Sequence, residues 1–280
     1  MATLGRNRYG KSRVRLSRIT RDTYHHDFDE WAVQVLLEGD FDASFTAADN
    51  SCVLPTDTMK NTVYYIARES KAETIEQFAQ ELGDYLLGNN AHVSKVSVEI
   101  EAKAWERMVV DGIAEPKTFK LGGPELQTAA AEKERGGAWS LVSGVDGLTI
   151  LKTSNSAFTG YIKDKLTTLK PATDRIFGTR ATVRWEYALA EPDYAAVRKR
   201  MIAILLKEFA AHDSKSVQHT LFDMGSAALK ALPQIARITL SMPNLHHLLA
   251  DLSPFGQDNP NHIFVPIDEP HGMIEATLER

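Results

Sequence analysis

The order of predicted elements repeats once along this chain of 280 residues, and the repeat limits the folds that the chain can adopt. In each half, strand patterns come first, two helical patterns follow, and further strands end the half. The strand pattern is clear at Val33, Val35 and Leu37, which line one face of an extended segment. The first half is predicted to contain strands at 12–21, 30–41 and 93–108 and helices at 57–68 and 73–88.

The second half is predicted to follow the same plan. Its strands are expected around 124–150, 181–189 and 234–242, and its helices at 193–211 and 214–229. Antiparallel sheets with helices on one face define the α+β class, here as two tandem repeats at 1–133 and 134–280. Such sheets have exposed edges, and symmetric oligomerisation into a closed barrel is one way to remove them.

Composition indicates a soluble globular protein and excludes several kinds of site. Hydrophobic residues make up 43% of the chain and charged residues 25%, and the net charge is −5, so no general attraction to nucleic acid or anionic membrane is expected. An anionic substrate would therefore need locally placed cations. Cys52 is the only cysteine, which rules out an intrachain disulfide and a cysteine-based zinc site.

The sequence also sets expectations about location. No apolar run approaches the roughly 20 residues that span a bilayer. The basic N-terminal stretch is not followed by the apolar core of a secretory signal, and the last residues are Leu278, Glu279 and Arg280 rather than a peroxisomal Ser-Lys-Leu. We therefore expect a cytoplasmic protein without a membrane partner.

A polar segment, LPTDTMKNT at 54–62, separates a predicted strand region from a helix. Thr56 or Asp57 is the predicted N-cap of that helix. A strand-to-helix junction presents free backbone N–H groups beside polar side chains, where an anion can bind. The same pattern also fits a capped helix start that binds nothing.

A second apolar run leads into a hydroxyl-rich turn, TILKTSNSAFTGY at 149–161. Together, the two segments resemble the urate oxidase (uricase) family. The resemblance continues in order along nearly the whole chain, through YGK at 9–11, LLEG at 36–39, ADNS at 48–51, DR at 174–175, SVQ at 216–218 and LSMPNLH at 240–246. It implies the tunnelling fold (T-fold), with two repeats per subunit, barrels closed by dimers, and two dimers stacked into a homotetramer.

Three residue types suit a flat, anionic heterocycle. Arg175 could clamp a planar oxyanion with two parallel donors, or it could simply pair with Asp174 on the surface. The Gln218 amide could match a lactam edge or face solvent, and Phe158 could stack on a ring or pack in the core. The resemblance implies a purine seat: Arg175 and Gln218 hold opposite ends of the ring, Val217 contributes its backbone, and Phe158 stacks on the face.

Lys11 taken alone is typical of a solvated lysine. A lysine, a hydroxyl and an imidazole in contact can instead transfer protons and hold an activated water. The resemblance implies such a relay from Lys11, Thr56 and His246, with Asn244 holding dioxygen and then water above the ring. It also implies that Asp57 donates a backbone N–H to the substrate, and that Lys11, Thr56 and Asp57 meet the purine seat of a neighbouring subunit.

No cofactor or metal motif is found. The adjacent histidines at 25–26 and 246–247 would point to opposite faces of a strand, and there is no His-Glu-x-x-His, Gly-x-Gly-x-x-Gly or phosphate-binding loop. The resemblance implies cofactor-free oxidation of urate by dioxygen and water to 5-hydroxyisourate and H2O2, because deprotonated urate is electron-rich enough to reduce dioxygen itself.

Two alternatives of other classes remain. One is a T-fold hydrolase or aldolase acting on pterins or guanine nucleotides, whose members anchor the heterocycle with a glutamate and in some cases bind zinc. Gln218 at the anchor position speaks against it. The other is a non-catalytic purine-binding protein, which would need Arg175 and Gln218 but not Lys11, Thr56 and His246.

Overall fold

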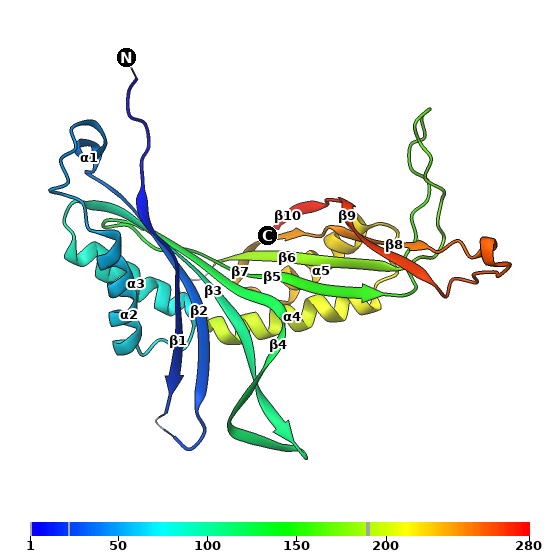
Figure 1. The fold of residues 1–280 in the computed structure, drawn as a ribbon, viewed down its shortest axis with the longest axis horizontal. Helices are drawn as coiled ribbons and strands as arrows, with labels where there is room; N and C mark the ends of the chain where they lie inside the picture. Colours follow the sequence, from blue (N-terminus) through cyan, green and yellow to red (C-terminus); the bar gives the residue numbers. More distant parts are fainter. Residues whose placement is uncertain (1, 22, 189–190) are drawn as a thin grey trace. The chain divides into compact units, whose positions relative to one another are not determined.

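The first unit of the chain is an antiparallel sheet with helices packed on one face (Figure 1). In the computed structural model, which describes residues 2–21, 23–188 and 191–280, the chain divides into two compact units, Met1–Val145 and Asp146–Arg280. The first unit contains strands β1 to β4 and the first half of β5, which continues into the second unit, in the order β1-β2-β3-β4-β5. Their bounds are Tyr9–Thr20, Asp27–Gly39, Val93–Val110, Ile113–Glu134 and Ser140–Lys152, and the helices are α1 (Asp42–Thr46), α2 (Thr56–Glu69) and α3 (Ile75–Asn89).

The core of the first unit lies between this sheet and helices α2 and α3. The predicted inward face of β2 is confirmed, since Val33, Val35 and Leu37 are fully buried. In the neighbouring strand β3, Val98 pairs with Val35 and is equally buried. Helix α3 covers this face with four side chains at helical spacing: Ile75, Phe78, Leu82 and Leu86.

Strand β1 carries a β-bulge beside the predicted site residue Lys11. Lys11 pairs with Val35, whereas Val14 pairs with Val33, so β1 contains one extra residue between them. Within the bulge, Arg13 adopts a left-handed backbone conformation with φ of 56°, which is unfavourable for a residue other than glycine. A Cβ atom at Gly10 would lie 1.8 Å from the carbonyl oxygen of Val35, so this close approach of the two strands requires glycine.

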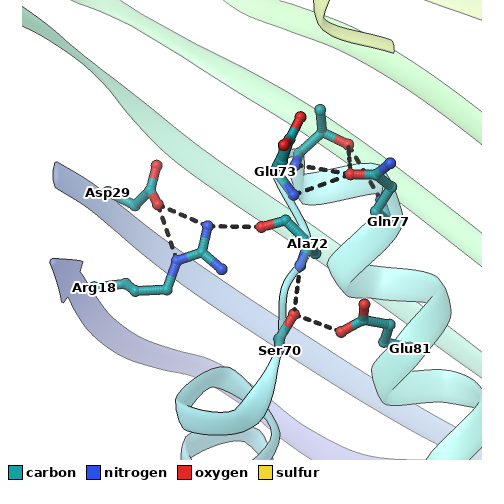
Figure 2. Close-up of polar contacts among 8 residues, drawn as sticks. Arg18, Asp29, Ser70, Ala72, Glu73, Gln77 and Glu81 are labelled. Carbon is teal, nitrogen blue, oxygen red and sulfur yellow. Dashed lines mark hydrogen bonds and ion pairs between the residues drawn. The ribbon is translucent and has the colours of Figure 1, made fainter. Parts of the chain in front are cut away.

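The loop between α2 and α3 is attached to the sheet by the half-buried Arg18 (Figure 2). Arg18 donates from Nη2 to the Ala72 carbonyl at 2.9 Å and from Nε and Nη2 to Asp29 Oδ2 at 3.1 and 2.9 Å. Its guanidinium also lies 4.6 Å from the Trp31 ring centroid. Partial burial raises the pKa of Asp29, and the charge of Arg18 opposes that shift. Arg18 thus attaches the loop to the sheet and compensates the charge of a half-buried carboxylate.

The second unit is a sheet with helices α4 and α5 packed beside it (Figure 1). Strand β6 pairs with β7, β7 pairs with β10, and β8 joins β6 to β9. Helix α5 contacts β7 and β10, and α4 packs against α5 and, through Phe209, against Phe177 of β6. The bounds are β6 Phe177–Tyr187, α4 Tyr194–Ala211, α5 Val217–Ala231, β7 Ile235–Ser241, β8 Asn244–Leu249, β9 Phe264–Gly272 and β10 Glu275–Glu279, with a short 3-10 helix at Ser253–Phe255.

The α+β class is confirmed, but several boundaries differ from the prediction. The strand expected at 181–189 ends at Tyr187, and residues 189–190 lie outside the described residues. The strand expected at 234–242 stops at Ser241, because Pro243 has no N–H for a ladder hydrogen bond, and a separate strand β8 begins at Asn244. His246 therefore lies inside β8 rather than at the end of the preceding strand.

The two compact units meet in sequence at Val145 and Asp146, twelve residues beyond the predicted repeat boundary at 133/134. Compactness and repetition are different properties, so the tandem repeats at 1–133 and 134–280 stay a prediction. No described helix combines the length and the hydropathy that a membrane span requires.

The capping box of α3 gives a stability prediction. Thr74 Oγ1 accepts from the Gln77 N–H at 3.3 Å, and Gln77 Oε1 accepts from the Thr74 N–H at 3.2 Å. Thr74→Ala removes the first of these bonds and should lower the free energy of unfolding by about 1 kcal/mol, measured by urea denaturation at fixed protein concentration. Thr74→Ser keeps the cap and should stay close to the unsubstituted protein; an equal loss in both variants would contradict the capping role.

Candidate functional site

Helix α2 begins at Thr56, at the junction that the sequence singles out. Its N-cap is Pro55, and no side chain caps it, so the prediction of Thr56 or Asp57 as N-cap is wrong. The physical reason is that Thr56 and Asp57 already have helical backbone conformations, which places their side chains within the first turn. Their backbone N–H groups have no acceptor within the helix and remain suited to an anion.

The Asp57 carboxylate makes an ion pair instead of a cap. Its Oδ1 accepts from Lys60 Nζ at 2.5 Å, and this contact is the main reason that the pKa of Asp57 is lowered. The charge of Lys11 lowers it further, so Lys11 lies on the same side of the junction. Lys11 and Thr56 are half-buried and Asp57 is exposed. We call Lys11, Thr56 and Asp57 the junction group.

Arg175 and Phe158 lie together in the second unit. The Arg175 guanidinium carbon is 5.4 Å from the centroid of the Phe158 ring. Burial lowers the pKa of Arg175, although an arginine stays charged at neutral pH, and its buried Nε has no hydrogen-bond partner in the structure. Tyr161 stacks on Phe158 with ring centroids 5.0 Å apart and an interplanar angle of 12°. A charged, dehydrated donor thus lies next to a pair of stacked aromatic rings.

Asp174 has partners other than the Arg175 guanidinium. Its Oδ2 accepts from Ser154 Oγ at 2.7 Å, and its Oδ1 accepts from the Ser156 N–H at 3.3 Å. These bonds, led by Ser154, lower the pKa of Asp174. Among the described side chains no ion pair joins Asp174 to Arg175, so the sequence alternative of a surface pair between them is not observed.

Backbone pairing brings the Phe158 segment to the start of helix α5. Ala157 N–H donates to the Ser214 carbonyl at 2.7 Å, three residues before the helix begins at Val217. Val217 is buried and Gln218 is exposed. Both belong to the first turn, where backbone N–H groups have no intrahelical acceptor. The backbone hydrogen bond between Ala157 and Ser214 therefore holds Phe158 close to the start of helix α5.

Asn244 and His246 complete this group from strand β8. Asn244 pairs with Thr179 of β6 and with Gly272 of β9, and its Nδ2 lies 3.4 Å from His246 Nδ1. Burial lowers the pKa of His246, and the positive charge of Arg175 lowers it further. The imidazole is thus kept neutral at pH 7 and can accept a proton. We call these residues the seat group, which comprises Phe158, Arg175, Val217, Gln218, Asn244 and His246.

The structure assigns the predicted site residues to two groups, one in each unit. The junction group surrounds the start of α2, and the seat group surrounds the start of α5 and strand β8. Their individual roles stay predictions. A cleft of about 1440 Å³ in the first unit, lined by residues such as Arg18, Trp105 and Phe119, does not include the junction group.

Sequence reasoning missed some contacts of the seat group. Tyr161 lies in the hydroxyl-rich turn at 149–161, but the sequence assigned it no role, although it stacks on Phe158. The charge of His271 lowers the pKa of His246, and His271 lies in strand β9, which was not predicted. The strand argument against chelation by adjacent histidines applies to 246–247, which lie in β8. It does not apply to 25–26, because these residues lie in the bend between β1 and β2.

The proximity of Arg175 and His246 gives a prediction that does not depend on turnover. Arg175→Met removes a positive charge that disfavours imidazolium, so the pKa of His246 should rise toward the ordinary histidine value. NMR titration of histidine-labelled protein measures it, with the resonance assigned by its loss in His246→Asn. An unchanged midpoint in Arg175→Met would mean that the two side chains are not electrostatically coupled.

Comparison with known proteins places this geometry in one family. The uricase family profile matches residues 7–132 and 141–275. The uricase of Arthrobacter globiformis is 42% identical over 277 residues, covering 99% of this chain and 90% of that protein. The uricase of Dictyostelium discoideum is 36% identical over 283 residues, covering 100% and 98%.

The fold agrees equally well with a solved structure. The crystal structure of the Arthrobacter globiformis uricase superposes with a TM-score of 0.94 at 41% identity, covering 100% of this chain and 96% of that one. The seat and junction groups both lie within the matched residues. From profile, relatives and fold together, the chain belongs to the uricase family.

Proposed function

We propose that this chain oxidises urate with dioxygen and water, giving 5-hydroxyisourate and H2O2. Membership of the uricase family over the whole chain is the observation that carries this proposal. The purine loses a pair of electrons, dioxygen gains them with protons to become H2O2, and the oxygen of water ends as the hydroxyl on C5. The reaction balances without a bound redox group, so the protein's task is to orient the reactants and move protons.

The seat group supplies the contacts that orient an anionic purine. Arg175 donates to one end of the ring, and its dehydrated Nε makes a charge-assisted bond there stronger than one in water. Gln218 meets the opposite end, and the Val217 N–H in the first turn of α5 adds a further donor. Phe158 stacks on the face of the purine ring, which fixes the orientation of the ring plane.

The proton relay uses Lys11, Thr56 and His246. His246 is neutral because burial and Arg175 lower its pKa, so it can take a proton that Thr56 passes on. Asn244 lies next to His246 and holds dioxygen and then water above the ring. The Asp57 N–H, in the open first turn of α2, binds a substrate oxygen.

We further infer a homotetramer in which each site combines the seat group of one subunit with the junction group of another. Membership of the uricase family supports this arrangement, and the two groups belong to different compact units of the chain. An oligomer would also remove the exposed edge of β1, which pairs only with β2 among the described strands.

A single assay tests the proposed reaction. Chelator-treated protein should consume urate, followed by loss of its absorbance, and should release H2O2 in equal amount. Lys11→Met should reduce turnover by about 10²–10⁴-fold, as expected for loss of a proton-transfer group. Turnover that disappears with the chelator while circular dichroism shows the protein still folded, and that returns with copper or zinc, would contradict cofactor-free chemistry. Binding of urate without its consumption would indicate a purine-binding protein instead.

Subunit mixing tests where the two groups meet. Arg175→Ala and Lys11→Met are each expected to be nearly inactive, but a hybrid interface pairs an intact Arg175 with an intact Lys11 from the other chain. Random pairing of the two variants makes about half of the interfaces hybrid. Each hybrid interface holds two sites, of which one is intact and the other carries both defects. About a quarter of full activity should therefore return after dissociation and reassembly.

The matched control for this mixture is Lys11→Met with Thr56→Val. Both substitutions lie in the junction group, so every hybrid site keeps one defect and no activity should return. Failure of Arg175→Ala and Lys11→Met to recover, despite subunit exchange shown by mass-labelled chains, would mean that each site is built within one chain.

A further inference from the structure

Two histidines and an aspartate converge where helix α4 ends and α5 begins. His212 is the C-cap residue of α4, and His219 and Asp223 are four residues apart on α5. His212 Nδ1 lies 3.0 Å from Asp223 Oδ2, and His219 Nε2 lies 3.6 Å from the same oxygen. One atom from each of the three side chains falls within 4.8 Å of the others. We call these three residues the helix-corner cluster.

The spacing of the three ligand atoms suits a transition-metal ion as well as a hydrogen bond between His212 and Asp223. Zinc binds histidine nitrogen and carboxylate oxygen at about 2.0–2.2 Å in a tetrahedron, so two of its ligand atoms lie roughly 3.3–3.5 Å apart. The two distances to Asp223 Oδ2, 3.0 and 3.6 Å, lie on either side of that separation. Residues at i and i+4 of one helix also point to the same side, as helical histidine-carboxylate ligands require.

His212 is held in a state that can bind a metal. Its side chain is 7% exposed, and its Nε2 is buried without a hydrogen-bond partner. Burial lowers the pKa of His212, and the nearby charges of His219 and Lys152 act in the same direction, whereas Asp223 and Glu208 oppose them. The imidazole is therefore neutral at pH 7. A neutral imidazole carries one proton, on either Nδ1 or Nε2. If Nδ1 binds the ion, the ring can carry its proton on Nε2, so His212 need not release a proton to solvent.

The cluster is open to solvent on one side. The His219 and Asp223 side chains are 47% and 34% exposed, so an ion can enter and keep a water as its fourth ligand. Asp223 compensates part of the ionic charge. The Lys152 ammonium donates to the His212 carbonyl, and its positive charge would repel a bound cation.

We propose that His212, His219 and Asp223 form a binding site for a divalent transition metal, zinc being the ion of matching ligand preference. The site joins the end of α4 to the start of α5 and lies outside the proton relay and the purine contacts. Bound ion would hold the two helix ends together and so raise thermal stability. It has no part in the oxidation proposed above.

The test uses full-length protein without an affinity tag, stripped with chelator and titrated with ZnCl2 by calorimetry. One zinc per chain should bind, and the melting temperature should rise with zinc concentration. His219→Ala and Asp223→Asn should each weaken zinc binding by at least about 10-fold and abolish the rise in melting temperature. Neither variant empties the buried position of His212, so both should fold.

His262→Ala is the matched control, because His262 is an exposed histidine of the same unit outside the cluster. It should bind zinc and gain stability like the unsubstituted protein. Absence of stoichiometric zinc binding, or binding that His219→Ala and Asp223→Asn leave unchanged, would overturn the proposal. The readouts are binding and melting, so this result and the urate assay can fail independently.

Discussion

Burial of one sheet face beneath a pair of helices is the constraint on which the rest of each unit depends. In the first unit, the alternating side chains of β2 and β3 face α3, and the position of α2 against β1 follows from the same buried layer. In the second unit, α5 lies on β7 and β10 with α4 beside it. Because the helices must cover these strands, the points where α2 and α5 start are fixed, and each group of predicted site residues includes the first turn of one of these helices.

The seat group illustrates how packing sets chemistry. The turn at 154–158 is tied to Ser214 by backbone pairing and to Asp174 by hydrogen bonds from Ser154 and Ser156. With Asp174 held in this way, Arg175 lies against Phe158 with a dehydrated Nε. Its charge then acts on His246 and favours the neutral imidazole. A structural loop thus sets the surroundings of Arg175 and, through the Arg175 charge, favours the neutral form of His246.

Periodicity predicted the α+β class, the helices and the inner faces of the main strands, because burial repeats every second residue in a strand and every three to four in a helix. It did not predict β8, β9 and β10, which are short or exposed, such as β10 with only Leu278 half-buried. The cap at Pro55 was missed because Thr and Asp are favoured caps, whereas the observed helix already includes Thr56.

The site residues were named from family resemblance rather than from chemistry, since an isolated arginine, glutamine or lysine fits a solvated surface equally well. What physical reasoning did anticipate is the need for local positive charge. The chain has a net charge of −5, so it repels an anion at long range. Lys11 beside the first turn of α2 and Arg175 beside Phe158 each place a cation near an open helix start or a flat ring.

Helix starts have a positive potential, and their N–H groups cannot be satisfied within the helix. The two units present such starts at Thr56 and Val217, one in each group of site residues. In the proposed oligomeric site, an anion would therefore meet two helix starts and two cations at short range, whereas the more distant charges of the chain are screened by salt. Each group alone supplies one helix start and one cation, and this is the electrostatic reason for combining both groups in the proposed site.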